Sequence, residues 1–170
     1  MQEIKNIEVE IDNLLTDNPQ LKNQADNMQT IPGIGKTTAV AILAESPDLS
    51  SFSSARELAA YAGLTPKHKT SGTSIRGKTS ILKIGSSNLR KALYFPAIVA
   101  KNHNPVFKDF IQKLSNKGKP TKVIIVAIMR KLLHIILELS EIIPHLTQIY
   151  FLTPNTVSEP FNLLFVTNTL

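Results

Sequence analysis

The sequence of 170 residues has no cysteine, no tryptophan, and only three tyrosines and seven phenylalanines. The absence of cysteine excludes disulfides, a thiol nucleophile and thiolate metal sites, and it suits a reducing cytoplasm. The scarcity of aromatic rings argues against a surface on which single-stranded bases stack. The charged first residues, MQEIKNIEVE, exclude a signal peptide. The most apolar stretch, residues 123–139, is interrupted by Arg130, Lys131 and Glu138, so we expect a cytoplasmic protein without a membrane span.

Acidic residues are missing from a large central part of the chain. Between Leu58 and Lys108 there is no aspartate or glutamate, whereas nine lysines and arginines lie there. Residues 58–131 have a net charge of +14, while residues 1–57 and 132–170 have net charges of −5 and −3. Surfaces that only confer solubility normally mix both signs. A stretch of one sign on this scale predicts a polyanionic partner, such as nucleic acid, that releases counterions on binding.

The N-terminal residues 1–19 have the pattern of an amphipathic helix. Apolar side chains recur at a spacing of three and four along residues 2–16, and the Asn18-Pro19 step ends the pattern. The stripe is narrow and flanked by charge, which resembles the seam of a coiled coil. Residues 20–29 predict a second, more polar helix.

The segment TIPGIGKTTAVAILAE at residues 30–45 allows two interpretations. A phosphate-binding loop of nucleotide hydrolases requires glycine where Thr30 stands and a buried strand before it, and residues 21–30 are too polar for such a strand. The alternative is a helix-hairpin-helix over residues 20–45, in which Pro32–Gly35 forms the turn. Gly33 and Gly35 allow positive φ angles there and have no side chain that would block close approach.

The helix-hairpin-helix interpretation predicts an anion site at the start of the second helix. Backbone amides at a helix N-terminus can bind a DNA phosphate without reading the base sequence. A purely structural hairpin is the alternative. The residues with outward-facing amides would be Gly33, Gly35, Lys36 and Thr37. The residues expected to pack the two helices together are Ile31, Ile34, Ala39 and Leu43.

The remaining pattern predicts a mainly α fold. Ser53 or Ser54 can cap a helix that begins at Ala55 and ends before Gly63. Residues 64–85 contain Ser, Gly and Lys without periodicity and predict a long irregular loop. Residues 138–170 show no clean period and predict a poorly specified tail. Further helices are expected from Ser86 or Ser87 through Lys101, from Pro105 to about Leu114, and from a cap at Thr121 through about Leu139.

Ser71 stands out within the expected loop because it precedes Gly72 and lies between Lys69 and Arg76. Nearby cations could stabilise the charge that develops on an attacked phosphate. The only base close in sequence is His68. From spacing alone, a serine in a polar loop is usually a hydrogen-bonding turn residue, so both interpretations stay open.

Several ordered motifs resemble a known family. IPGIG at residues 31–35, ELAAYAGLTP at 57–66, TSG at 70–72 and KIGSSNLRKALY at 83–94 resemble the C-terminal half of DEDD-type bacterial insertion-sequence transposases, which include the RNA-guided bridge recombinases. The resemblance covers residues 20–137. It implies DNA transposition by a serine nucleophile that becomes linked to DNA through a phosphoserine. The matching position is Ser71, with Thr70 and Ser74 as alternatives.

The resemblance has further implications for partners and cofactors. It implies DNA and guide RNA as partners, a homo-oligomer, and an N-terminal acidic domain whose four carboxylates bind Mg²⁺. No such set of carboxylates occurs in this sequence, so no metal site is expected in the chain itself. We therefore expect a truncated transposase that is inactive alone, with a non-catalytic nucleic-acid-binding module as the alternative. The cations that the resemblance implies near nucleic acid are Lys67, Lys69, Arg76, Lys78 and Arg90.

Overall fold

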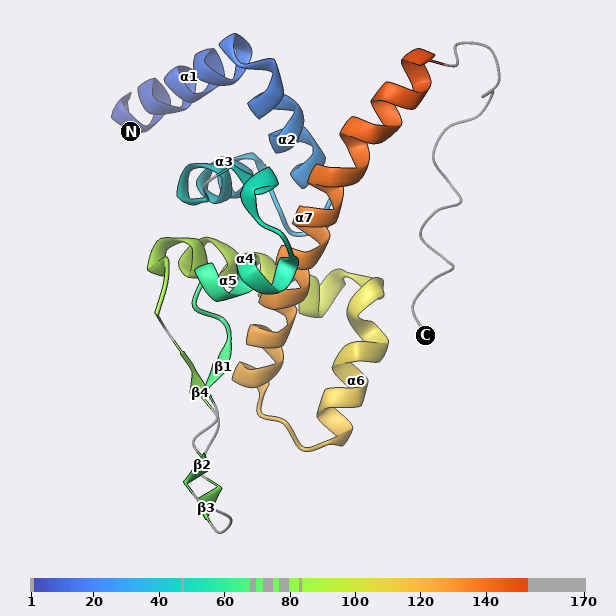
Figure 1. The fold of residues 1–170 in the computed structure, drawn as a ribbon. Helices are drawn as coiled ribbons and strands as arrows, with labels where there is room; N and C mark the ends of the chain where they lie inside the picture. Colours follow the sequence, from blue (N-terminus) through green and yellow to red (C-terminus); the bar gives the residue numbers. More distant parts are fainter. Residues whose placement is uncertain are drawn as a thin grey trace.

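The computed structural model describes residues 2–46, 48–67, 70–71, 75–76, 80–82 and 84–152, with the backbone alone for residues 67, 70–71, 75–76 and 141–152. The described part contains seven α-helices and four strands of two residues each, so the predicted mainly α fold is confirmed (Figure 1). The helices are α1 (Gln2–Asp17), α2 (Pro19–Gln29), α3 (Lys36–Glu45), α4 (Ala55–Tyr61), α5 (Ser87–His103), α6 (Lys108–Asn116) and α7 (Thr121–Leu152). Two short 3₁₀ turns cover Leu49–Ser51 and Pro105–Phe107.

Helix α7 forms the centre of the core. Figure 1 shows it running through the middle of the molecule, with α2, α4, α5 and α6 arranged along it. Its buried side chains recur every three or four residues, which places them on one broad face. Burial of each large aliphatic side chain stabilises the fold by about 1.5–3 kcal/mol. The buried residues of α7 are Ile124, Ile125, Ile128, Met129, Leu132, Leu133, Ile136 and Leu137.

The expected end of this last helix near Leu139 is wrong, because the backbone is helical through Leu152. Apolar residues continue at helical spacing in the sequence beyond Leu139, at Ile142, Ile143 and Leu146. Pro144 removes one backbone hydrogen bond, which weakens a helix without always ending it. The backbone of residues 138–152 is thus helical, although the sequence shows no clean periodicity there.

Helix α1 has the predicted bounds but contributes no buried residue to the core. Ile4, Ile7 and Leu14 are 63%, 56% and 61% exposed. Figure 1 shows α1 extending from the body at the end opposite to the α6–α7 turn. Leu15 at the end of the helix packs against the core. Most of the apolar stripe is therefore exposed within the described part of the chain, and its coiled-coil character stays a prediction.

Helices α2 and α3 form the predicted helical pair around the Pro32–Gly35 turn. The predicted packing is confirmed, since Ile31, Ile34 and Ala39 are buried and Leu43 packs against the core. Gly33 has a φ angle of 101°. Gly35 does not use the positive φ that glycine allows, because it has a φ of −92° and a ψ of 173°. Gly35 is the N-cap residue of α3, and N-cap residues normally adopt such extended angles.

The start of α4 confirms the predicted serine cap. The Ser54 hydroxyl accepts a hydrogen bond from the Glu57 backbone N–H. The Glu57 carboxylate in turn accepts hydrogen bonds from the Ser53 hydroxyl at 2.8 Å and the Ser53 backbone N–H at 2.9 Å. These two bonds lower the pKa of Glu57. Gly63, with a φ of 65°, follows the helix as predicted.

The segment expected to be an irregular loop contains two antiparallel strand pairs. We call the strands β1 (Pro66–Lys67), β2 (Thr70–Ser71), β3 (Ile75–Arg76) and β4 (Ser80–Ile81) the β arm. Strand β1 pairs with β4, and β2 pairs with β3. A chain that turns back on itself can satisfy its backbone groups through such pairing, which the Gly/Ser/Lys composition does not reveal. Figure 1 shows the β arm projecting from the helical body, with β2 and β3 farthest out.

Two glycines allow close backbone contact at the base of the β arm. The Ser86 N–H donates to the Tyr61 carbonyl oxygen at 2.8 Å, and the Leu82 N–H donates to the Thr65 carbonyl oxygen at 2.9 Å. A Cβ atom at Gly85 would overlap the Tyr61 carbonyl oxygen, and one at Gly63 would lie within 3.2 Å of the backbone of Ile84. The base of the β arm therefore has no space for a side chain at either glycine.

Candidate nucleic-acid interface

The N-terminus of α3 presents uncapped amides to solvent. Gly35, Lys36 and Thr37 are exposed, and no side chain caps the helix at Gly35. The first amides of a helix have no partner within the helix and carry its positive dipole end. This end can therefore accept an anion such as a phosphate oxygen.

Gly33 has a different role from the other glycine of the turn. It is half-buried, and a Cβ atom there would lie 3.1 Å from the Pro96 carbonyl oxygen and 3.2 Å from the Val99 Cβ. The turn thus packs directly on α5. At Gly35, by contrast, an added Cβ would meet nothing within 4 Å. Gly33 positions the hairpin, and its predicted contact with DNA stays a prediction.

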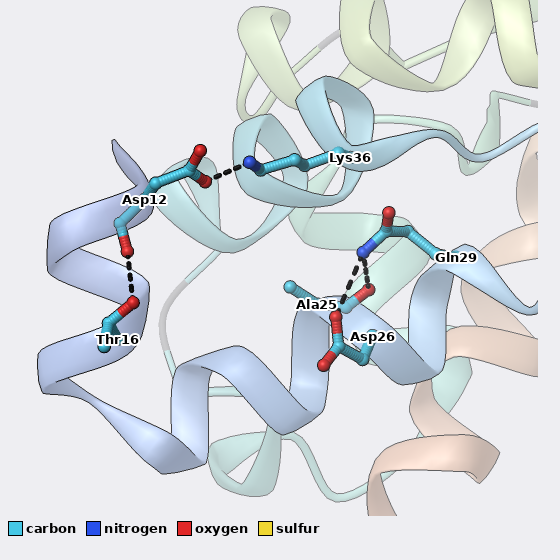
Figure 2. A network of polar contacts seen from close by, with 6 residues as sticks. All are labelled: Asp12, Thr16, Ala25, Asp26, Gln29 and Lys36. Atoms are coloured by element: carbon cyan, nitrogen blue, oxygen red, sulfur yellow. Dashed lines mark hydrogen bonds and ion pairs between the residues drawn. The ribbon is translucent and has the colours of Figure 1, made fainter. Parts of the chain in front are cut away.

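The Lys36 ammonium group forms an ion pair with the Asp12 carboxylate of α1, as Figure 2 shows. The two side chains are 46% and 53% exposed. Exposed pairs of this kind contribute at most about 1 kcal/mol. The Thr16 hydroxyl donates to the Asp12 carbonyl oxygen at 2.8 Å on the same helix. Asp12 therefore competes with any phosphate for the Lys36 cation, a contact that the sequence did not reveal.

Arg90 links two helices at the base of the β arm. Its Nη1 donates to the Ala62 carbonyl oxygen at 2.8 Å, and the side chain is half-buried. Ala62 is the C-cap residue of α4, whose carbonyl oxygens carry the negative dipole end. Arg90 therefore has a structural role that spacing alone did not predict, while its predicted contact with nucleic acid stays a prediction.

Glu45 at the end of α3 is a positioning residue that the sequence analysis missed. Its carboxylate accepts from the Asn88 amide at 3.0 Å and from the Ser86 hydroxyl at 3.2 Å, at the N-terminus of α5. Its carbonyl oxygen accepts from the Tyr61 hydroxyl. A carboxylate at a helix N-terminus is favoured by the dipole. Glu45 therefore ties the helical hairpin to both helices that carry the β arm.

The backbone places Ser71 on β2 near the far end of the β arm. Ser71 pairs with Ile75, and Thr70 pairs with Arg76. The backbones of Ser71 and Arg76 thus lie on adjoining strands, as the sequence spacing suggested. Lys69, Lys78 and Ser74 lie outside the described residues, and Lys67 is described only by its backbone on β1.

The predicted site residues do not form one cluster. Figure 1 shows the far end of the β arm well away from the α2–α3 hairpin, so Ser71 and the uncapped N-terminus of α3 are separate features. Among the residues that the structure describes, no three His, Asp or Glu side chains are grouped so that they could hold a metal ion. None of the helices in this part is both long and apolar enough to cross a membrane.

A segment with a large excess of lysine and arginine and no carboxylate, such as residues 58–108, is typical of proteins that bind nucleic acid. Comparison with known proteins agrees with this class. The family model described as "Transposase IS116/IS110/IS902 family" matches residues 25–112, which is just over half of the chain. The chain belongs to this family of transposases.

Individual proteins also match this chain. The "Pilin gene-inverting protein" of Moraxella bovis is 44% identical over 133 residues, which cover 78% of this chain and 41% of that protein. The "Transposase for insertion sequence element IS1328" of Yersinia enterocolitica is 34% identical over 95 residues, which cover 54% of this chain and 26% of that protein. This chain thus spans about two fifths of the length of the Moraxella relative.

Proposed function

We propose that this chain is the DNA-binding, serine-bearing part of a transposase and that Ser71 is its nucleophile. The observation that carries the proposal is the location of Ser71. It lies on the projecting β arm, within the segment that has no acidic residue and within the residues that match the family model. An arm that extends from the body can reach a DNA backbone without moving the helical core.

The proposed reaction is a transesterification. The Ser71 oxygen forms a bond to a DNA phosphorus atom, and the bridging bond from that phosphorus to a deoxyribose oxygen breaks. The proton of the serine hydroxyl ends on the leaving oxygen. A second DNA hydroxyl then attacks the phosphoserine and takes over the phosphoryl group, which restores the serine and joins the strands. Arg76, whose backbone lies on the adjoining strand, would stabilise the charge on the attacked phosphate.

DNA binding in this proposal uses two surfaces. The exposed amides of Gly35, Lys36 and Thr37 bind a phosphate at the N-terminus of α3, and the cations of the β arm bind the backbone near Ser71. The proposal assigns Mg²⁺ to an acidic domain of the family, and no step above uses it. Guide RNA and a homo-oligomer belong to the same proposal.

The test is covalent trapping of labelled DNA. The chain is mixed with a purified acidic domain of a family member, Mg²⁺ and DNA, and protein-linked DNA is separated on a denaturing gel. We expect an adduct with the wild-type chain and none with Ser71→Ala. DNA binding by Ser71→Ala should be unchanged.

Ser74→Ala is the matched control, because it removes a hydroxyl three residues away and should leave the adduct intact. An adduct that still forms with Ser71→Ala and is lost with Ser74→Ala or Thr70→Ala would assign the nucleophile to Ser74 or Thr70 instead. A wild-type chain that binds DNA but forms no adduct would instead favour a non-catalytic binding module. The exposed, uncapped N-terminus of α3 is the observation that favours this second candidate.

A further inference from the structure

A group of exposed lysines occupies the turn between α6 and α7. We call residues 113–122 the lysine turn. It contains Lys113, Lys117, Lys119 and Lys122 within ten residues and no acidic residue. All four side chains are exposed. The lysine turn lies beyond the residues that match the family model, which end at position 112.

The lysines of this turn are not neutralised within the described part of the chain. The ion pair found there joins Lys36 to Asp12 on other helices. Asp109 lies one helical turn before Lys113 on α6, without an ion pair between them. Lys131 differs, because its ammonium group lies 4.7 Å from the centroid of the Phe110 ring and is held against α6. Four like charges therefore lie within ten residues of one another without a carboxylate partner in the described part of the chain, which favours the binding of an anion.

Two backbone hydrogen bonds order the lysine turn. The Gly118 N–H donates to the Ser115 carbonyl oxygen at 2.8 Å, and the Lys119 N–H donates to the Leu114 carbonyl oxygen at 3.1 Å. These two bonds, with a φ of 65° at Gly118, form a Schellman motif. Pro120 follows and restricts the chain further. A partner that binds here pays little conformational entropy for ordering the backbone.

The start of α7 adds a second feature that favours an anion. The Pro120 carbonyl oxygen accepts hydrogen bonds from the Val123 and Ile124 amides, so the cap residue is Pro120 and not Thr121 as expected. Proline has no side-chain acceptor for the first amides of the helix. The first turn of α7 has no acidic residue and carries Lys122. A cation at a helix N-terminus opposes the dipole by about 0.3–1 kcal/mol. A bound phosphate would satisfy the amides and reverse this unfavourable interaction.

We propose that the lysine turn is a further contact surface for the backbone of double-stranded DNA, separate from the α3 N-terminus and the β arm. Figure 1 shows the α6–α7 turn at the same end of the helical body from which the β arm projects. A duplex bound at the arm can therefore extend toward the turn. This inference rests on the proposed DNA-binding function.

The test compares the salt dependence of DNA affinity in matched variants. Lys117→Gln/Lys119→Gln removes two charges from the lysine turn, and Lys5→Gln/Lys22→Gln removes two exposed charges from α1 and α2. Each lost phosphate contact lowers the slope of log K against log salt by about 0.9. The affinity advantage of the wild type over the turn variant should therefore shrink about tenfold between roughly 50 and 200 mM salt. The α1–α2 variant should retain the wild-type slope.

Each outcome decides a separate point. A wild-type chain whose binding to duplex DNA does not depend on salt would refute the proposed function and this inference with it. Steep wild-type binding with equal slopes for both variants would refute the lysine turn alone. A loss seen only with duplex RNA of the same sequence would refute the assignment to DNA. Circular dichroism of both variants checks that the helices are retained.

Discussion

Two glycines with the same backbone angle provide a direct test of how the β arm is attached. Gly63 and Gly118 both have a φ of 65°. A Cβ atom at Gly118 would meet nothing within 4 Å, whereas one at Gly63 would lie 2.7 Å from the Ile84 carbonyl oxygen. Replacement by alanine therefore imposes the same backbone strain at both positions and a steric overlap at only one.

The magnitudes follow from these surroundings. Alanine in the left-handed region costs about 1–2 kcal/mol, which is the full loss expected for Gly118→Ala. Overpacking adds about 1–3 kcal/mol, and the Ile84 oxygen belongs to backbone that cannot rotate away. Arg90 also approaches Gly63, so its hydrogen bond to Ala62 would be disturbed. We expect Gly63→Ala to lose about 2 kcal/mol more than Gly118→Ala.

Urea unfolding followed by circular dichroism measures the difference. With an m value of about 2 kcal/mol per molar, the midpoint of Gly63→Ala should lie about 1 M below that of Gly118→Ala. Equal midpoints, or a lower midpoint for Gly118→Ala, would show that the base of the β arm is not packed as described.

Three further predictions concern exposed polar contacts. Ser54→Ala should lower the free energy of unfolding by about 1 kcal/mol, because it removes the α4 cap. The hydroxyl and the backbone N–H of Ser53 lower the pKa of Glu57 from its ordinary value of 4.5. The stability that the ionised carboxylate provides is therefore present above pH 4.5 and is lost as the pH falls through the lowered pKa. The advantage of the wild type over Glu57→Gln in urea titrations should accordingly shrink on acidification, and an advantage that grows would contradict this. Asp12→Asn should lower stability by at most about 1 kcal/mol, because its pair with Lys36 is exposed, and should raise DNA affinity in anisotropy titrations. A reduced affinity would argue against phosphate binding beside Lys36.

Local patterns predicted most of the helices because their causes lie close together in the sequence. The Ser54 cap, the helix end at Gly63 and the break at Asn18-Pro19 depend on residues within one or two turns. The buried face of α7 follows from apolar spacing alone. The strand pairs of the β arm were missed because strands of two residues have no measurable period, and their pairing joins positions up to fifteen residues apart.

The candidate site was predictable only in part, for the same reason. The uncapped start of α3 follows from the glycine turn, and the family resemblance indicated Ser71. The structure alone assigns structural hydrogen bonds to Arg90 and Glu45, because their partners are distant in sequence. It also decides that the turn glycine against α5 is Gly33, since the space around a glycine depends on a helix more than sixty residues away.

By itself, the sequence determined the class of fold, and its charge distribution predicts a polyanionic partner. Both follow from composition and from short-range periodicity, which can be read from the sequence without knowing the contacts between distant residues. Only the tertiary structure decided which cations remain free of carboxylates, which glycines tolerate a side chain and how the β arm leaves the body. These properties depend on contacts between residues that are distant in the sequence. Packing and Coulomb interactions depend on the distance between atoms in space and not on their separation along the chain.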